Sequence, residues 1–261
     1  MRTLIAVLAL LLLGGISSAA APAEESSTRT RLDAVTARGE LRVCSTGDYR
    51  PFTHRAPDGT WSGIDIDLAR DLATRLGVRL TLVETTWATL LPDFRRRCDV
   101  AVGGISVTLD RARQAFFTKP YVRDGKTPIT RCENAPRFQT LEQIDQPGVR
   151  VVVNPGGTNE QFARANLKHA ALRVHPDNNT IFTEIVEGRA DLMMTDATET
   201  RWQAKQHPEL CAVHPDTPFT FSEKAYLLPQ GDVVFQQWVD QWLNLARNDG
   251  TWERVTKPWL G

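Results

Sequence analysis

The sequence predicts an α/β protein of two lobes, each a mostly parallel sheet flanked by helices, with a ligand cleft between the lobes. A strand–helix–strand–helix–strand order over residues 41–102 returns over residues 149–196, and this alternation is typical of parallel sheets. Two connecting segments, at 127–132 and 211–219, indicate that the chain crosses to a second lobe and then returns. Ligands of such sheets bind at the carboxyl ends of the strands.

The first repeat contains three predicted strands and two predicted helices. Its clearest helix runs from Ile64 to Leu76, because apolar residues recur at four-residue steps and a glycine follows at the cap position. Residues 78–83 alternate with the period of two that a strand requires. The other elements are a strand at 41–44, a helix at 88–96 and a buried apolar strand at 99–102.

The second repeat follows the same order. The valine-rich strand 149–153 ends in Asn154, and the apolar strand 190–194 ends at Thr195 and Asp196. Both buried strands therefore end in polar side chains, where a ligand site is expected. The remaining predicted elements are a helix at 160–167, a strand at 172–175, a helix at 181–188 and a closing helix at 233–246.

These elements divide the chain into two lobes joined by two crossover hinge segments. We expect residues 30–127 and 218–261 in lobe 1, and residues 128–217 in lobe 2. A cleft between lobes is the usual place for a small ligand. Lysine and arginine number 31, as do aspartate and glutamate, so no basic surface is expected for nucleic acid or an anionic membrane. The predicted partner is a small molecule.

The first 23 residues have the pattern of a secretory signal peptide. Arg2 precedes an apolar run from Leu4 to Leu13, and small residues with an Ala-x-Ala site follow. A membrane anchor is the alternative, but the run is too short and is interrupted by Gly14-Gly15. No later segment approaches 18 apolar residues, so no membrane span is expected after removal of the signal.

Export permits disulfides among the four cysteines, for which three pairings are possible. Cys132 leaves the first crossover and Cys211 approaches the second. We therefore predict a Cys132–Cys211 disulfide where the hinge segments run side by side, with Cys44 and Cys98 reduced inside lobe 1. The cysteines form no Cys-x-x-Cys pair and the histidines are scattered, so no metal site is expected.

A series of motifs in order resembles the periplasmic amino-acid-binding proteins, which are the solute receptors of ABC importers. The resemblance covers nearly the whole chain after the signal. It is carried by Leu41-Arg42-Val43, Tyr49-Arg50-Pro51-Phe52, Gly63–Ala69, Asp99–Arg111, Phe117–Tyr121 and Asp249–Gly261. It implies the two-lobed binding-protein fold and a periplasmic location.

The second half is similar to one branch of that superfamily, the periplasmic cyclohexadienyl dehydratases. The stretches that carry this are Tyr121–Thr130, Phe138–Val149, Val153–Glu160 and Asp191–Glu199. Those enzymes convert prephenate to phenylpyruvate, or arogenate to phenylalanine, with loss of CO2 and water. The resemblance therefore implies a lyase of phenylalanine biosynthesis built on a receptor fold.

The resemblance also implies which residues bind the substrate. Arg111, five residues after Ser106, is expected to grip a carboxylate with its planar guanidinium, although it also fits a surface arginine at a helix start. Thr158, after Gly157, adds donors at a helix N-terminus, a pattern that alone is usually only a turn. Asp196 holds the ligand ammonium in the receptors, which leaves both prephenate and arogenate open as substrates.

Two aromatic residues are candidate walls for a six-membered ring. Trp87 and Tyr49 are expected in loops after predicted strands, near the cleft. Ordinary packing within the lobe is the alternative, because buried aromatic residues more often belong to a core than to a site.

The expected catalytic residues are Glu199, Lys126 and Asn154. Receptors typically carry a small apolar residue where this chain has Glu199, and the dehydratases have a glutamate that faces the ligand. Hydroxide leaves only when protonated, and a buried carboxyl with a raised pKa can supply the proton. Lys126 would bind substrate or tune Glu199, and Asn154 would orient the ring carboxylate or the departing hydroxyl. The alternatives are a glutamate placed by the helix dipole and a solvated hinge lysine.

The predicted function is therefore that of a periplasmic cyclohexadienyl dehydratase acting on prephenate, arogenate or both. No cofactor is expected, because aromatisation of the ring drives the elimination, and no protein partner is required. The alternative is a non-catalytic amino-acid receptor of an ABC importer, or more remotely a ligand-sensing subunit. A receptor has no need for a carboxyl group aimed at an apolar ring.

Overall fold

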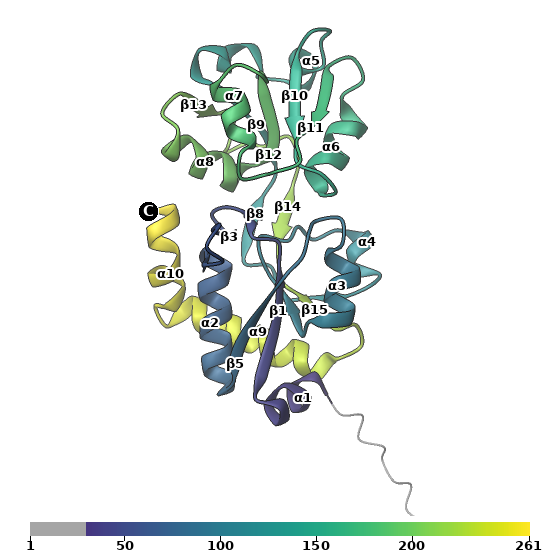
Figure 1. The fold of residues 1–261 in the computed structure, drawn as a ribbon, viewed down its shortest axis with the longest axis vertical. Coiled ribbons are helices and arrows are strands. Elements are labelled where there is room, and N and C mark those ends of the chain that lie inside the picture. Colours follow the sequence, from purple (N-terminus) through teal and green to yellow (C-terminus); the bar gives the residue numbers. More distant parts are fainter. Residues whose placement is uncertain (1–29) are drawn as a thin grey trace, which may run out of the picture.

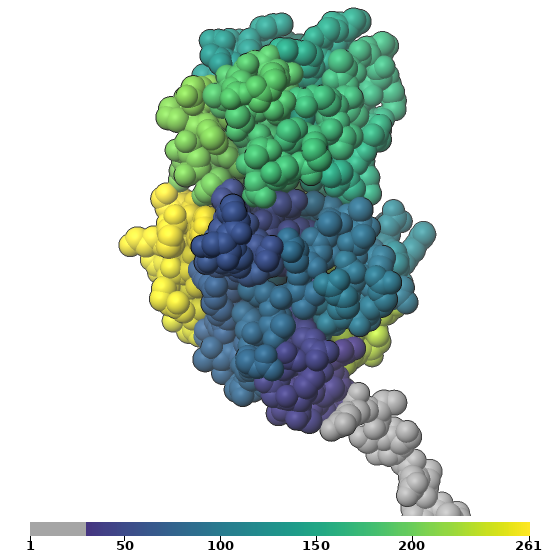
Figure 2. Space-filling view, viewed as in Figure 1, coloured from purple at the N-terminus to yellow at the C-terminus, as the bar shows by residue number. Residues whose placement is uncertain are grey.

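The computed structural model describes residues 30–261, which form two lobes stacked along the long axis of the molecule (Figure 1). The predicted signal peptide lies outside the described residues. Figure 2 shows the two lobes in contact, with the C-terminal helix beside their junction. Within residues 30–261, no helix combines the length and the apolar character needed to cross a membrane.

Lobe 1 is built on a five-stranded sheet whose first three strands are parallel. In spatial order the strands are β5 (Arg79–Glu84), β1 (Glu40–Ser45), β6 (Val100–Ala101), β15 (Leu227–Leu228) and β7 (Phe116–Phe117). The last two run antiparallel to their neighbours. Because β15 comes from the C-terminal part of the chain, the chain returns to lobe 1 after it has built lobe 2. A small second sheet contains β2 (Asp48–Tyr49), β3 (Thr53–Arg55) and β4 (Trp61–Ser62).

Helices cover the lobe 1 sheet and close its core. The predicted helix at 64–76 is α2 (Ile64–Leu76), and Gly77 ends it in the left-handed conformation, with φ 67°. Leu68 and Leu72 of α2 pack into a core that also contains Trp242. The other helices of this lobe are α1 (Arg31–Arg38), α3 (Leu90–Arg97), α4 (Leu109–Ala112), α9 (Val233–Asn248) and α10 (Thr251–Leu260).

Lobe 2 has a similar sheet, again with three parallel strands followed by two strands that each pair antiparallel with the strand before them. In spatial order the strands are β11 (Ala171–Val174), β10 (Arg150–Val153), β12 (Leu192–Asp196), β9 (Lys126–Arg131) and β13 (Leu210–Ala212). Apolar clusters pack on both faces of this sheet. One contains Val151 and Val153, and the other contains Val152 and Met193. The helices are the 3-10 helix η1 (Cys132–Arg137), α5 (Leu141–Ile144), α6 (Thr158–Asn166), α7 (Ile181–Val186) and α8 (Ala197–Gln206).

One predicted connection is a strand. Residues 127–132, expected as a crossover, lie mostly in β9, which runs antiparallel to β12 with Pro128 opposite Met194. Proline obscured this strand because it cannot donate to a sheet ladder, but the Pro128 carbonyl accepts a hydrogen bond from the Val213 N–H. The lobes are instead joined by the antiparallel pair β8 (Val122–Asp124) and β14 (Ser222–Lys224), which lies between them in Figure 1.

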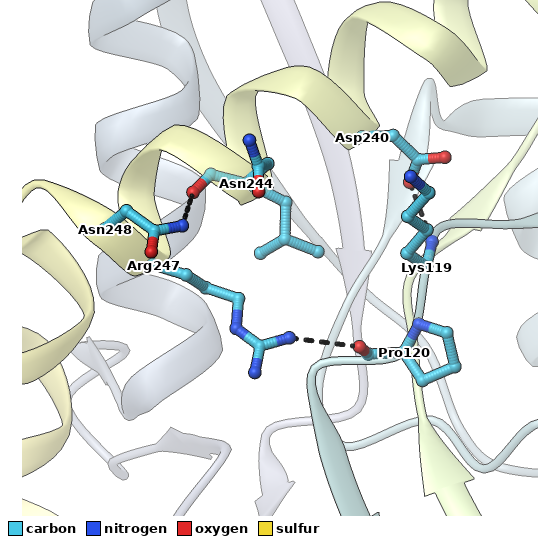
Figure 3. Close-up of a pocket in the computed structure, with 7 residues that line it drawn as sticks. Lys119, Pro120, Asp240, Asn244, Arg247 and Asn248 are labelled. Carbon is cyan, nitrogen blue, oxygen red and sulfur yellow. Dashed lines mark hydrogen bonds between the residues drawn. The ribbon is translucent and has the colours of Figure 1, made fainter.

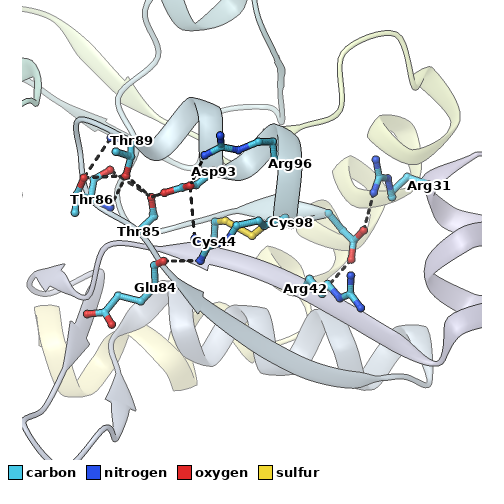
Figure 4. Close-up of a disulfide and its surroundings, with 12 residues drawn as sticks. Arg31, Arg42, Cys44, Glu84, Thr85, Thr86, Thr89, Asp93, Arg96 and Cys98 are labelled. Carbon is cyan, nitrogen blue, oxygen red and sulfur yellow. Dashed lines mark hydrogen bonds and ion pairs between the residues drawn. A yellow bond between two sulfur atoms is a disulfide. The ribbon is translucent and has the colours of Figure 1, made fainter.

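The structure contains two disulfides. The predicted Cys132–Cys211 bond is present, but it joins the start of η1, directly after β9, to β13 within lobe 2 and not the two hinge segments. The prediction that Cys44 and Cys98 stay reduced is wrong, because these two residues form the second disulfide (Figure 4). Cys44 on β1 lies beside Ala101 of β6, and Cys98 ends α3 just before that strand, which brings their Cα atoms to 5.7 Å.

Side chains and backbone of the protein also connect the lobes outside the hinge. Asn178 in lobe 2 donates to the Asp48 carbonyl in lobe 1 over 2.7 Å. At the outer edge, the rings of Trp202 on α8 and Trp259 on α10 have centroids 6.2 Å apart. Lys205 donates to the main-chain carbonyl of Gly261 over 2.8 Å. The two lobes therefore touch both at the cleft and at the C-terminal helix.

Candidate active site

A small cavity lies between the lobes, beside the carboxyl ends of β1, β10 and β12. Its volume is about 10 Å³, enough for one water molecule, so a ring-sized ligand requires the lobes to move apart. The structure brings seven of the predicted site residues into its wall, together with Gly104 and Asn159. These seven are Tyr49, Trp87, Ser106, Asn154, Gly157, Thr158 and Asp196.

Asp196 is the most strongly paired group in the cavity. It is the last residue of β12, and its two oxygens lie 2.8 Å from Lys126 Nζ and 2.6 Å from Lys224 Nζ. The Tyr49 hydroxyl donates to the same carboxylate over 2.6 Å. Burial alone would raise the pKa of Asp196, but the two ammonium groups outweigh it and hold the pKa below its ordinary value. Asp196 Oδ2 is therefore hydrogen-bonded to protein donors, whereas Oδ1 has an ion-pair partner in Lys126 but no hydrogen-bond partner among the described residues.

Lys126 stands between Asp196 and the N-terminus of α6. It is the first residue of β9 and lies directly opposite Asp196 in the sheet register. Its ammonium donates to Thr158 Oγ1 over 2.9 Å and to the side-chain oxygen of Asn159. Burial lowers its pKa, and the charge of Asp196 opposes that shift. Lys126 is thus buried in lobe 2 and paired with Asp196.

Glu199 is 1% exposed and lies in the first turn of α8. It accepts a hydrogen bond of 2.5 Å from the Thr195 hydroxyl and is not part of the cavity wall. Burial raises its pKa well above the ordinary value, the hydrogen bond from Thr195 opposes this, and the charges of Asp196 and Asp48 add to it. The pKa values of two neighbouring carboxyls are therefore shifted in opposite directions, that of Glu199 upward and that of Asp196 downward.

An amide pair links the lysine to the glutamate. Asn159 Nδ2 donates to Asn154 Oδ1 over 2.9 Å and to Thr195 Oγ1 over 3.0 Å, while its oxygen accepts from Lys126. Since Thr195 in turn donates to Glu199, the predicted residues Lys126, Asn154 and Glu199 belong to one hydrogen-bonded network. Asn159, which the sequence did not single out, is the residue that connects them.

Lobe 1 supplies Arg111 and the aromatic residues Tyr49 and Trp87, which face this network. The Arg111 guanidinium donates to the Ser106 carbonyl over 2.8 Å and lies 5.9 Å from the centroid of the Trp87 ring. Burial lowers the pKa of Arg111 to about 10, so it remains cationic at neutral pH. The Tyr49 and Trp87 rings meet edge to face with centroids 5.6 Å apart. Tyr49 lies in β2 and not, as expected, in a loop.

A glycine pair shapes the lobe 1 wall. Gly104 has φ 67°, and a Cβ there would stand 2.5 Å from the Phe52 ring, so only glycine fits. Asp65, on α2, accepts hydrogen bonds from the N–H groups of Gly103 and Gly104 and from the Tyr121 hydroxyl. Burial raises the pKa of Asp65 to about 6 in spite of these donors. The cleft loop is therefore fixed from inside the lobe 1 core.

Sequence reasoning missed Lys224 and Asp48 as well as Asn159. Lys224 is 0% exposed and ends the hinge strand β14. Its only sequence signal is a lysine at the head of the apolar run Ala225–Leu228. Asp48 accepts a hydrogen bond of 3.0 Å from the indole N–H of Trp87, a partner that lies 39 residues away and that no local pattern could indicate.

A larger hollow lies away from these residues. It has a volume of about 280 Å³ and lies on lobe 1 between α9 and the segment at Lys119 and Pro120 (Figure 3). Asp240 accepts from the Lys119 N–H over 2.7 Å, and Arg247 donates to the Pro120 carbonyl over 3.3 Å. The polar groups of this hollow thus fix α9 against the loop, and none of the predicted site residues lines it.

Comparisons with known proteins agree with the two-lobed fold. Residues 41–261 match the family model of bacterial extracellular solute-binding proteins, family 3. A cyclohexadienyl dehydratase from Pseudomonas aeruginosa is 56% identical over 260 residues, which cover 99% of this chain and 94% of that protein.

Two solved structures of ancestral proteins are also similar. One is an amino-acid-binding protein described as a precursor of cyclohexadienyl dehydratase, with 34% identity and a TM-score of 0.81, covering 88% of this chain and 99% of its own. The other is a variant of an ancestral cyclohexadienyl dehydratase, with 50% identity and a TM-score of 0.56, covering 88% and 96%. The chain therefore belongs to family 3 of the bacterial extracellular solute-binding proteins and, within it, to the cyclohexadienyl dehydratases.

Proposed function

We propose that this protein converts prephenate to phenylpyruvate by a decarboxylating dehydration, with arogenate as a second substrate class. The observation that carries the proposal is the pair of buried carboxyls with opposite pKa shifts, Glu199 raised and Asp196 lowered. Such a pair is the usual arrangement where one carboxyl acts as an acid and the other stays charged.

In this proposal Glu199 is the general acid. Dehydration breaks the ring C–O bond, and hydroxide leaves as water only if a proton reaches it. The bond between the ring and its carboxylate breaks at the same time, CO2 departs, and the released electron pair completes the aromatic ring. Glu199 gives up its proton in this step and regains one from solvent when the lobes open. General acid catalysis of this kind is worth about 10²–10⁴-fold in rate.

The charged residues around Glu199 bind and orient the substrate. Arg111 in lobe 1 presents two donors to the carboxylate of the side chain, a geometry that matches guanidinium. Lys126 and the amide of Asn154, on the opposite side of the cleft, meet the ring substituents. Closure of the lobes excludes water, which strengthens each of these contacts. Glu199 enters the cleft by releasing Thr195, because its present hydrogen bond holds it behind the cavity wall.

We infer a periplasmic location from the family and from the predicted signal peptide at residues 1–23. The two disulfides are compatible with an oxidising compartment. Fractionation of cells that produce the full chain tests this inference, since the protein should appear in the periplasmic extract without its first 23 residues.

The direct test of the activity is incubation of the purified protein with prephenate. Phenylpyruvate should form, which is measured by its absorbance in alkali, and no metal or organic cofactor should be needed. Glu199→Gln is the matched control, because it preserves size and hydrogen bonding but lacks the acidic proton. Absence of phenylpyruvate with the wild-type protein, together with tight binding of an amino acid, would instead favour a receptor.

A further inference from the structure

We propose that Asp124 is a positioning residue for Glu199, because it caps helix α8 in place of the helix's own N-cap residue. Asp124 ends the hinge strand β8, and Glu199 lies in the first turn of α8. This inference rests on the proposed function for the role of Glu199 as the general acid. It adds a residue of the hinge to the groups on which that role depends.

Helix α8 does not cap its own first turn. The first N–H groups of a helix have no partner within the helix, and an aspartate at the N-cap position usually accepts a hydrogen bond from one of them. Asp196 occupies this position with extended backbone, but its side chain makes no such bond. Its carboxylate lies instead against the ammonium groups of Lys126 and Lys224. The residue that could cap α8 is thus committed to the cleft.

The hinge supplies the missing acceptors. Asp124 Oδ1 accepts a hydrogen bond of 3.1 Å from the Thr198 N–H, and the Gly125 carbonyl accepts one of 2.9 Å from the Ala197 N–H. A Cβ on Gly125 would stand 1.8 Å from the Thr220 carbonyl oxygen, so the chain passes this point only with glycine. The two residues that open α8 are therefore bonded to consecutive residues of the hinge.

Burial makes the Asp124 contact difficult to replace. The side chain is 0% exposed, and among the described residues Oδ2 has no hydrogen-bond partner, with Lys224 Nζ of the second hinge strand 4.0 Å away. Burial raises the pKa of Asp124, the charge of Lys224 opposes this, and the charge of Asp196 adds to it. Loss of Oδ1 would leave the Thr198 N–H buried without an acceptor, which favours fraying of the first turn.

A frayed first turn would change Glu199 in two ways. Its carboxyl would no longer be held for proton transfer, and a misplacement of about 1 Å can cost about 10²-fold in rate. Its side chain would also lose burial, which is the main cause of its raised pKa. Arg111, the proposed carboxylate-binding residue, lies in lobe 1 and does not depend on α8. The cap should therefore affect the chemical step more than substrate binding.

The test separates the hydrogen bond of Asp124 from its bulk. Asp124→Ala removes the acceptor, and Asp124→Asn retains Oδ1. In Asp124→Ala, kcat for prephenate should fall by about tenfold or more while KM changes by less than about threefold. The alkaline limb of the kcat/KM profile should move to lower pH, toward an ordinary glutamate. Asp124→Asn should show little of either effect.

Asp216→Ala is the matched control. Asp216 is an exposed aspartate that also contacts α8, through an ion pair of 2.6 Å with Arg201 beyond the first turn. Its loss should leave both kcat and the alkaline limb unchanged.

Wild-type kcat and an unshifted limb in folded Asp124→Ala would overturn the proposal. Equal losses in Asp124→Ala and Asp124→Asn would also overturn it, because the cap would then not be the cause. If Asp124→Ala does not fold, amide hydrogen exchange of the wild-type protein decides: the Thr198 N–H should be protected, and exchange at the rate of an unprotected amide contradicts the cap. Failure of the proposed function is distinct, because it appears as no turnover of prephenate by the wild-type protein.

Discussion

Thr195 Oγ1 donates a 2.5 Å hydrogen bond to Glu199 Oε2, across the junction between the last residues of β12 and the first turn of α8. Because the bond favours the ionised form of the acid, it limits how far burial raises the pKa of Glu199. Thr195 thus adjusts the acidity of Glu199 and restrains its side chain.

Glu199→Gln should lower kcat for prephenate by about 10² or more, since glutamine cannot donate an acidic proton. The KM should change much less, because the shape of the site is retained. Steady-state kinetics with prephenate measure both constants. Turnover near the wild-type value would remove Glu199 from the mechanism and leave it a buried residue of the α8 N-terminus.

Thr195→Val should move the alkaline limb of the kcat/KM profile, which reports the free enzyme, to higher pH. The active form of Glu199 is protonated, so activity is present below its pKa and is lost as the pH rises through it. Loss of the Thr195 donor removes an interaction that lowers this pKa, and the limb must shift upward. A pH–rate series for both proteins checks the direction, and a downward shift would contradict the assignment of the limb to Glu199.

Stability should respond to the same carboxyl. The pKa of Glu199 is raised in the folded protein, so folding binds a proton above the unfolded pKa and stability falls as the pH increases toward the folded pKa. Glu199→Gln has no such dependence. The difference in unfolding free energy, variant minus wild type, should grow with pH by up to about 1.4 kcal/mol per unit. Denaturant titrations between pH 4 and pH 8 measure it.

Arg111→Ala should mainly raise KM, because Arg111 contacts a carboxylate that is present before and after the reaction. The expected loss in kcat/KM is about 10²-fold, as for a charge-assisted bidentate contact. The side chain also lies against Trp87, so Arg111→Lys serves as a control that keeps the charge. A collapse of kcat at unchanged KM would show that Arg111 acts in the chemical step.

Peptide mapping without reduction should recover Cys44 joined to Cys98 and Cys132 joined to Cys211. The bonds close loops of 54 and 79 residues, and each should contribute about 2–4 kcal/mol. Paired alanine substitutions, measured by thermal unfolding, give the two contributions separately. A free thiol at Cys44 or Cys98 in the secreted protein would contradict the first pairing.

The sequence was informative where structure depends on local periodicity. The helix Ile64–Leu76 was predicted to the residue, since its apolar spacing and terminal glycine are local properties. The helix predicted at 160–167 is α6, which begins earlier, at Thr158. The predicted site threonine therefore lies in its first turn. Strand β9 was missed because its pairing with β12 spans more than 60 residues and its proline disguises it.

The site was predictable to the extent that strand ends carry polar residues. Asn154 and Asp196 were found in this way, and the family resemblance added Glu199 and Lys126. Lys224 was not found, because its contact with Asp196 depends on the folding of the hinge and not on any spacing along the chain. The binding and catalytic roles, and the residue limits predicted for the two lobes, stay predictions until the experiments above are done.

The contacts between the lobes bear on whether the protein works as a transport receptor or as an enzyme. Tyr49 and Lys224 hold Asp196 across the cleft, Asn178 meets the Asp48 carbonyl, and Trp202 lies against Trp259. In a transport receptor, closure of the lobes signals that a ligand is bound, and the importer responds only to the closed conformation. A receptor whose own side chains hold the lobes closed would give this signal even when its cleft contains no ligand. An enzyme has no importer that responds to its shape, so closure of the empty cleft gives no false signal, although the lobes must still open to admit substrate and release product.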